Sequence, residues 1–287
     1  MKVFGISNAS ETPGFPEAPP PPPPPPPPTK MPRKNLYIAI GLIAVVAAAS
    51  AFAFIYFMSS GGPSGGQSGE GATIPLSMNY VEGEGMTYSI TITISGMGQT
   101  YTQTATMHME IVDFDGQIYT IHYDMNMQGQ SLEFTIKMDK TGYVIEGLPP
   151  ELQQYYGAFT SIPGYGSYFP KPEMRVGESF QIPLNLDISG IHMTGTMDFR
   201  ISELTTKTFS NIGTLRVFKL EVSAPNIQAT YQGFNMAVNL NGYGYYEYGT
   251  CLPVECVIQE SISLAYGGQT YTMNLDMQMR LTEHNKP

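Results

Sequence analysis

The chain has 287 residues, of which 13% are charged, and it contains 24 prolines, 30 glycines and no tryptophan. Its net charge is −10, and residues 73–287 alone hold 21 acidic and 10 basic side chains. This balance excludes nucleic acid as a partner, because contacts with phosphate groups require a basic face.

The N-terminal tail, residues 1–35, is rich in proline and lacks a periodic apolar pattern, so we expect it to be disordered. Residues 19–28 are an unbroken proline run. Proline fixes φ and has no N–H, so the run should form a polyproline II rod of about 31 Å. It is either a stiff spacer or a ligand for a cytoplasmic domain with an SH3-, WW- or profilin-like groove.

Residues 36–58 contain no charged side chain and are long enough to span a membrane. A helix of this length covers about 35 Å, which exceeds a hydrocarbon core of ~30 Å. The stretch is too long for a cleaved signal peptide, so we expect one uncleaved signal-anchor helix. Lys30, Arg33 and Lys34 precede it, and the next basic residue is Lys137. The positive-inside rule therefore predicts a single-pass cell-membrane protein with a cytoplasmic N-terminus and its C-terminal part outside.

A Gly/Ser linker at residues 59–72 leads into residues 73–287, where apolar and polar side chains alternate strictly. A period of two predicts half-buried antiparallel strands. Glycine-containing turns, such as those at Gly98, Gly116 and Gly190, separate the alternating stretches. We therefore expect an all-β ectodomain, built as a long antiparallel meander that curls into a half-barrel or folds into two packed sheets.

Similar sequence stretches within the ectodomain favour an internal duplication. The stretches at 87–96 and 179–190 both end in Ile-Ser-Gly, and each is followed by a strand that contains Thr-Met. A duplication would make residues 86–147 and 178–249 two copies, and residues 250–283 an added hairpin. The alternative is that alternating strands resemble one another through composition alone.

The only two cysteines, Cys251 and Cys256, lie in the stretch TCLPVEC. A zinc site needs about four ligands, and this pair has no histidine near it in the sequence. Outside the cytoplasm the pair is expected to form a disulfide at the tip of a hairpin.

The stretch TMHMEIVDFDGQIYTIHYDMNM, residues 106–127, combines Met-x-Met pairs with His108 and His122, which raises the alternative of a soft-metal (copper) protein. A tight loop at Gly116 would place His108 opposite His122 and Met109 opposite Ile121. The methionines and the histidines would then point to opposite faces of the sheet. We therefore expect core methionines that include Met107, Met109, Met125 and Met127, more exposed histidines and no metal site.

Catalytic chemistry finds little support in the sequence. The chain has four histidines, no cysteine nucleophile and no phosphate-binding loop, and acidic residues on the polar faces of strands are normally only solvated. We therefore expect neither an enzyme nor a cofactor.

Residues 148–175 separate the two candidate copies and cannot form a regular strand, because glycine and proline interrupt them. Their aromatic side chains are candidates for a ligand lid or groove, or for a permanent plug in the core: Tyr155, Tyr156, Phe159, Tyr165, Tyr168 and Phe169.

This insertion, the long antiparallel pattern and the Gly-Glu-Ser-Phe stretch at 177–180 resemble the LolA/LppX-like lipoprotein-carrier superfamily. The resemblance implies a curved sheet around an apolar groove that short helices close. The chain differs from those carriers in its transmembrane anchor. We expect a non-catalytic binding domain at the outer membrane face, for a lipid or another apolar ligand. The rival expectation is a structural or adhesive surface module with a filled core.

Overall fold

The computed structural model describes residues 71–127, 129–150, 153, 172–188, 190–231, 234–266 and 268–287. Contacts between Cα atoms divide the chain into two units, Met1–Met31 and Pro32–Pro287, and every described residue belongs to the second unit. Within the described part of the chain, no helix has the length and apolar character needed to cross a membrane. The proline-rich tail, the expected membrane span at 36–58 and most of the linker lie outside the described residues.

Most of the described residues lie in antiparallel strands, which confirms the expected all-β ectodomain. In chain order the strands are β1 (Thr73–Pro75), β2 (Gly85–Gly96), β3 (Gln99–Phe114), β4 (Ile118–Met127), β5 (Gln130–Asp139), β6 (Val144–Glu146), β7 (Glu173–Arg175), β8 (Ser179–Ile188), β9 (Ile191–Phe209), β10 (Gly213–Tyr231), β11 (Phe234–Glu247), β12 (Pro253–Tyr266) and β13 (Gln269–Asn285).

Eleven of these strands form one sheet in the order β6-β5-β4-β3-β2-β13-β12-β11-β10-β9-β8, while β1 and β7 pair separately. The sheet therefore consists of two meanders, β2–β6 and β8–β13, which are joined where β2 pairs with β13. One consequence is that β6 and β8, which residues 147–178 connect, are the two opposite edges of the sheet.

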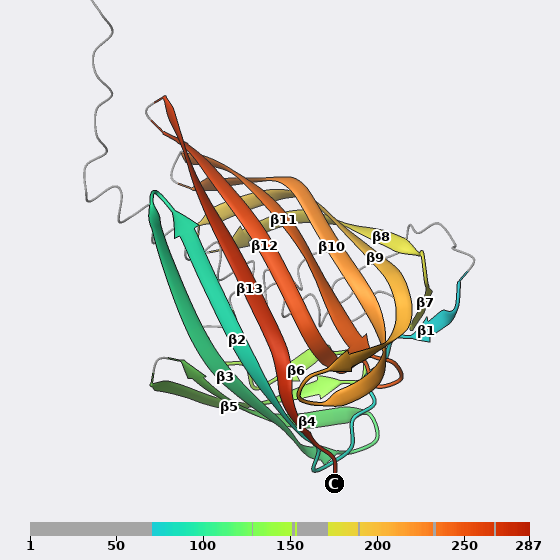
Figure 1. Cartoon of the computed structure of the whole chain (residues 1–287). Coiled ribbons are helices and arrows are strands. Elements are labelled where there is room, and N and C mark those ends of the chain that lie inside the picture. Colours follow the sequence, from blue (N-terminus) through green and yellow to red (C-terminus); the bar gives the residue numbers. More distant parts are fainter. Residues whose placement is uncertain are drawn as a thin grey trace, which may run out of the picture. The chain divides into compact units, whose positions relative to one another are not determined.

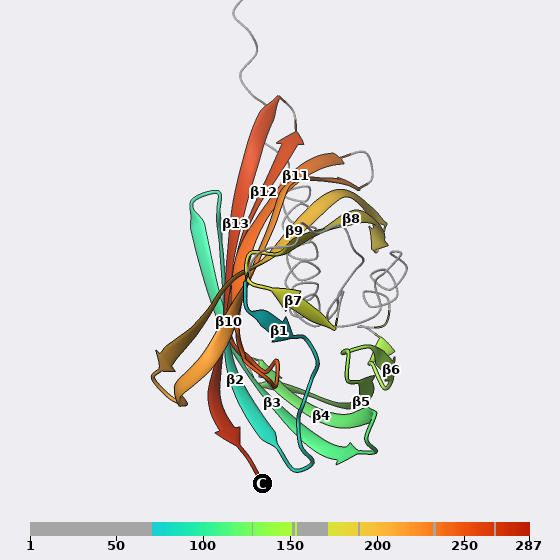
Figure 2. The same cartoon turned by 90° about the vertical axis from the view of Figure 1, so that its right-hand side faces the viewer.

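The large sheet is strongly curved. Figure 1 shows its long central strands, and Figure 2 shows that β4–β6 and β8–β9 wrap toward the same side, where β1 and β7 lie. We call the side that faces β1 and β7 the inner face, and the opposite side the outer face.

Side-chain alternation places the apolar residues on the inner face. Along β13, for example, Met273, Leu275, Met277, Met279 and Leu281 are buried, and the polar residues between them face outward. Most of the hairpin turns are tight. At the β2–β3 turn both loop residues have positive φ (Met97 50°, Gly98 77°), as a type I′ turn requires.

The two meanders begin with the same turn. The backbone N–H of Val81 donates to the Glu84 carboxylate at 2.9 Å, and the N–H of Arg175 donates to the Glu178 carboxylate at 2.9 Å. The residue before each glutamate is a glycine with positive φ, 82° in the first turn and 90° in the second. In both turns that glycine and the glutamate exchange backbone hydrogen bonds with an isoleucine on the second strand of the meander, Ile111 on β3 or Ile201 on β9.

Candidate functional site

The six aromatic residues expected to form a lid or groove, Tyr155, Tyr156, Phe159, Tyr165, Tyr168 and Phe169, lie outside the described residues. The two ends of their segment are described. Leu148 is partly buried against the core on one side, and the carbonyl of Pro172 accepts a hydrogen bond from Leu76 N–H (2.8 Å) on the other. Both ends thus meet the core, and the segment connects the two edges of the sheet.

The inner face of the sheet is a continuous apolar surface rich in methionine. Its buried methionines lie on six strands: Met86, Met107, Met109, Met138, Met193, Met197, Met236, Met273, Met277 and Met279. Methionine is unbranched and polarizable, so it adapts to irregular neighbours better than branched side chains do. A surface with this composition suits either an irregular core or an adaptable apolar ligand.

Glu260 interrupts this apolar face. It lies on β12 between Ile258 and Ile262, opposite Leu240 on β11 and Leu275 on β13, and it is only 3% exposed. Glu260 therefore places a carboxyl group within an otherwise apolar layer. Glu84 and Glu178 are also buried, but both cap turns, so Glu260 is the buried acid that lies within a strand of the described sheet.

Sequence reasoning missed Glu260, although a signal was present. Along β12, every second residue from Val254 to Leu264 is apolar except Glu260. An acidic residue in phase with a buried apolar series is the pattern that marks a candidate polar contact in a binding face.

A second polar position lies nearer to the strand ends of the inner face. The Tyr88 hydroxyl is fully buried and has no hydrogen-bond partner among the described residues. Burial, followed by the nearby Cys256 thiol, raises the pKa of Tyr88 well above its usual value. Burial also raises the pKa of Cys256, and contact with the Tyr246 hydroxyl offsets part of this rise. At neutral pH these groups are therefore uncharged hydrogen-bonding groups within an apolar surface.

The predicted disulfide between Cys251 and Cys256 is not formed. Both thiols are free, and both are buried. Cys251 lies in the β11–β12 turn with a φ of 56°, and its Sγ lies 3.4 Å from the carbonyl oxygen of Pro75. Cys256 lies in β12, opposite Gly244. An extended strand rises about 3.3 Å per residue, so β12 carries Cys256 about 10 Å beyond Pro253. A disulfide requires its Cα atoms to lie within about 7 Å.

An N-terminal strap, residues 73–80, crosses one end of the inner face. Its alternate side chains, Ile74, Leu76, Met78 and Tyr80, are buried. Its backbone bonds to both halves of the sheet: Met78 N–H donates to the carbonyl of Lys140 at 2.9 Å, and Pro75 accepts the Cys251 thiol. The strap therefore closes this end of the inner face, and it continues directly from the linker.

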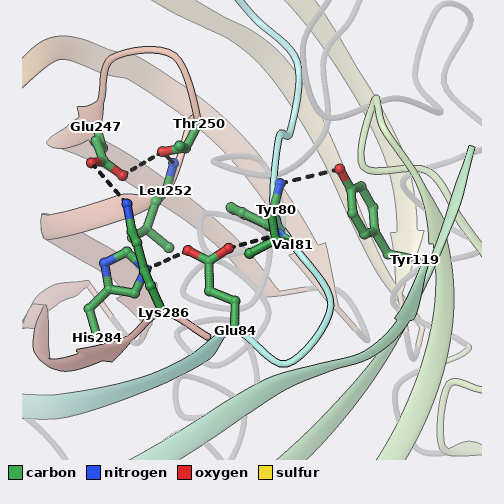
Figure 3. A network of polar contacts seen from close by, with 9 residues as sticks. All are labelled: Tyr80, Val81, Glu84, Tyr119, Glu247, Thr250, Leu252, His284 and Lys286. Atoms are coloured by element: carbon green, nitrogen blue, oxygen red, sulfur yellow. Dashed lines mark hydrogen bonds and ion pairs between the residues drawn. The ribbon is translucent and has the colours of Figure 1, made fainter. Parts of the chain in front are cut away.

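A polar network fixes the strap end to the end of the chain (Figure 3). The Tyr119 hydroxyl lies 3.2 Å from Tyr80 N, and His284 Nε2 lies 2.5 Å from Glu84 Oε1. Glu247 accepts a hydrogen bond from the Thr250 hydroxyl at 2.7 Å and pairs with Lys286 at 3.8 Å. These partners are satisfied structural contacts rather than an open site.

The Met- and His-containing hairpin, β3–β4, has a different register from the expected one. His108 pairs with Asp124, and His122 pairs with Glu110, so the two histidines are not opposite each other. The turn places Tyr119 opposite Phe114, and a one-residue bulge follows between Ile111 and Asp113. Beyond the bulge the pairing differs by two residues from the expected one, so each side chain keeps its expected face. The structure therefore does not bring the histidines together as a pair of ligands.

The methionines of this hairpin are buried only in part. Met107 and Met109 are buried and Met125 is partly buried, whereas Met127 near the hairpin end is 38% exposed. The expectation that all four are core residues is wrong for Met127. Among the described residues, no group of three or more His, Cys, Asp or Glu side chains is placed to hold a metal ion.

A comparison with models of known protein families found no match, and a comparison with curated protein sequences found none either.

Proposed function

We propose that this protein is a single-pass membrane protein whose ectodomain, residues 73–287, binds a lipid or another apolar ligand on its inner face without catalysis. The observation that carries the proposal is one curved sheet with a continuous apolar face, whose two opposite edges are connected by the aromatic segment. A sheet that is apolar on one face must cover that face with a second layer. The strap supplies part of this layer, at one end.

The position of Glu260 supports an amphipathic ligand rather than a pure hydrocarbon. Binding sites for small molecules are mostly apolar, with a few polar groups that set the orientation of the ligand. Glu260 lies on β12, a central strand of the sheet, with leucine and isoleucine around it. A ligand with an apolar chain and a hydrogen-bond-donating head would complement this arrangement.

The second candidate function is a structural or adhesive surface module with a filled core. It is favoured by the near-complete burial of inner-face residues such as Ile262 (1% exposed) and Leu275 (4% exposed). The two candidates differ in one respect, because only a binding domain must admit an apolar molecule to the inner face.

A pair of adjacent substitutions on β12 tests the proposal. Leu264 faces inward and is buried, whereas its neighbour Ser263 faces outward. In full-length protein in lipid nanodiscs, Leu264→Gln should weaken binding of the apolar fluorescent probe N-phenyl-1-naphthylamine by about tenfold, and Ser263→Gln should leave it unchanged. Absence of saturable probe binding by the unaltered protein would favour the filled core.

Replacing residues 158–170 with a short Gly/Ser loop separates the same candidates independently. A segment that covers a ligand should leave the melting temperature nearly unchanged and alter probe binding. A segment that is a permanent part of the core should lower the melting temperature sharply when it is removed.

The proposed topology places the proline-rich tail in the cytoplasm and the sheet outside, as Lys30, Arg33 and Lys34 predict. Protease added to intact cells should digest residues 73–287 and spare the proline run. Protection of the sheet would contradict the proposed location.

We also propose that residues 86–147 and 178–249 are copies of one ancestral unit, with residues 250–283 as an added hairpin. The turns at the start of the two stretches share the same glycine conformation and glutamate hydrogen bond. Gly177 has open space where the methyl group of an alanine would lie, so that substitution adds backbone strain alone. Gly83→Ala and Gly177→Ala should each cost about 1–3 kcal/mol of unfolding free energy. Tolerance of alanine at only one site would argue against equivalent turns.

A further inference from the structure

The outer face of the sheet carries a hollow of about 490 Å³ over β8–β12, on the opposite side from the proposed apolar site. The outside of a curved sheet is expected to be convex, so a hollow there needs a cause. Figure 2 shows that the tip of the β9–β10 hairpin projects to the outer side, away from β1 and β7. The bent hairpin and the outer face of β11 and β12 together shape the hollow.

Three contacts hold the hairpin in this bent position. Lys207 on β9 has its Nζ 3.0 Å from the Glu255 carboxylate on β12 and 3.7 Å from the ring centroid of Tyr245 on β11. The Tyr245 hydroxyl donates to Glu203 on β9 at 3.0 Å. Neighbouring strands lie about 4.8 Å apart, so β9 and β12 would be separated by about 14 Å in a flat sheet. A lysine on β9 reaches β12 only because the strands bend.

The floor of the hollow is a row of polar side chains on adjacent strands. The register places Asp198 beside Ser223, Ser223 beside Asn241, and Asn241 beside Gln259. Amide, carboxylate and hydroxyl groups thus follow one another across four strands at the strand spacing. Amide groups both donate and accept hydrogen bonds, as the hydroxyl groups of a polyol also do.

The charges in the hollow balance one another. Asp198 and Glu221 line it together with Arg200 and Lys219. Lys219 Nζ donates to Glu221 Oε1 at 2.7 Å, and this bond holds the pKa of Glu221 below its usual range. An uncompensated charge that would select an anion or a cation is therefore absent from this set of four side chains.

Tyr243 adds an aromatic surface beside the polar row. It is half-buried on β11, opposite Glu221, and its ring lies 5.0 Å from Lys219 Nζ and in edge contact with Tyr245. These contacts fix the ring, so it offers a rigid apolar patch with a polar border. The hollow is within the range of about 300–1,000 Å³ typical of small-molecule sites.

We propose that this outer hollow binds a neutral oligosaccharide. Such a ligand presents hydroxyl groups, which match the mixed donors and acceptors of the polar row, and C–H surfaces, which match the ring of Tyr243. An apolar ligand would cover the polar row without forming hydrogen bonds with it, and nucleic acid would find no excess of positive charge in the hollow. The site is independent of the inner face, so one protein would hold an apolar ligand and a glycan on opposite sides of the sheet.

The test uses full-length protein in nanodiscs and a set of probes: maltohexaose, cellohexaose, chitohexaose and mannohexaose, with a heparin hexasaccharide as the anionic comparison. Saturation-transfer NMR should detect at least one neutral probe, and calorimetry should give it a Kd of about 1 mM or lower. Asn241→Ala and Tyr243→Ala should each weaken binding by about tenfold, whereas Tyr243→Phe keeps the ring and should retain most of it.

Gln278→Ala is the matched control, because Gln278 is exposed on the same outer face, on β13, and does not line the hollow. It should bind the probe as the unaltered protein does. Circular dichroism melting curves show whether each variant is folded. The proposal is overturned if none of the neutral probes binds, if only the anionic probe binds, or if folded Asn241→Ala and Tyr243→Ala variants bind without loss. The inner-face experiments do not depend on this outcome.

Discussion

His284 and Glu84 are 200 residues apart in the sequence, yet His284 Nε2 lies 2.5 Å from Glu84 Oε1. Both side chains are largely buried, with 9% and 3% of their surface exposed. The contact joins the last strand, β13, to the turn that precedes β2, and these two strands are where the two meanders meet. The central seam of the sheet is therefore closed by residues from the two ends of the domain.

Removing one partner of this pair should be costly. His284→Ala leaves the buried Glu84 without its side-chain partner, so we expect the unfolding free energy to fall by about 3–5 kcal/mol. The exposed pair Lys137–Glu146, with a 2.7 Å contact and side chains 50% and 61% exposed, is the control. Glu146→Ala should cost much less, because solvent screens an exposed ion pair. Urea unfolding of the full-length protein in detergent measures both losses, and equal values would contradict the structural role of the buried pair.

The two cysteines should react only after unfolding. Burial raises the pKa of Cys251 to about 12, and burial also raises the pKa of Cys256, so neither thiol is ionised at pH 8 in the folded protein. The thiolate is the reactive form. Ellman's reagent, without added reductant, should titrate no thiol in the native full-length protein and both thiols in denaturant. A denatured protein without reactive thiols would restore the disulfide that the sequence suggested.

Methionine burial in the β3–β4 hairpin predicts unequal effects of two similar substitutions. Met109 is 6% exposed and Met127 is 38% exposed. Met109→Ala should lower the unfolding free energy by about 2–5 kcal/mol, because it leaves a cavity, and Met127→Ala should cost clearly less. Thermal or urea unfolding measures the difference. Tight binding of Cu(I) or Ag(I) that Met109→Ala abolishes would instead support a soft-metal site.

Glu260 should give the inner face a preference for ligands that carry a positive or hydrogen-bond-donating head. We expect the full-length protein to bind dodecylamine about tenfold more tightly than dodecanol, measured by displacement of N-phenyl-1-naphthylamine. Glu260→Gln should reduce this preference while the melting temperature shows that the protein is folded. The adjacent outward-facing variant Ser261→Ala should keep it. A preference that persists in Glu260→Gln would make Glu260 a structural residue only.

The period-two alternation predicted antiparallel strands and the face of the sheet that each side chain occupies. That prediction succeeds because alternation reports burial directly, as β13 illustrates. The register of β3 with β4 was wrong by two residues, because neither the pairing at the turn nor the one-residue bulge between Ile111 and Asp113 leaves a clear signal in the alternation of the strands. The pairing of β2 with β13 joins residues such as Ile92 and Met277, which no local pattern connects.

The predicted disulfide was wrong and the outer hollow was not predicted, and both outcomes depend on how the strands run. Short cysteine spacing suggests a loop closure, but an extended strand separates Cys256 from the turn that holds Cys251. The outer hollow depends on bending of the β9–β10 hairpin, so its residues looked like ordinary solvated positions in the sequence. The sequence shows Glu260 as a polar residue within an apolar series. Only the structure shows that this series, and Glu260 with it, lies on the inner face.

Native mass spectrometry of the full-length protein, released from detergent micelles after gentle purification from its own membrane, tests the proposed function most directly. The inner face is predicted to retain an apolar ligand, so a population of chains should carry an added mass of discrete value, and Leu264→Gln should reduce this population. A single peak at the mass of the bare chain, together with no saturable binding of N-phenyl-1-naphthylamine, would contradict the proposal and leave the inner face as a filled core.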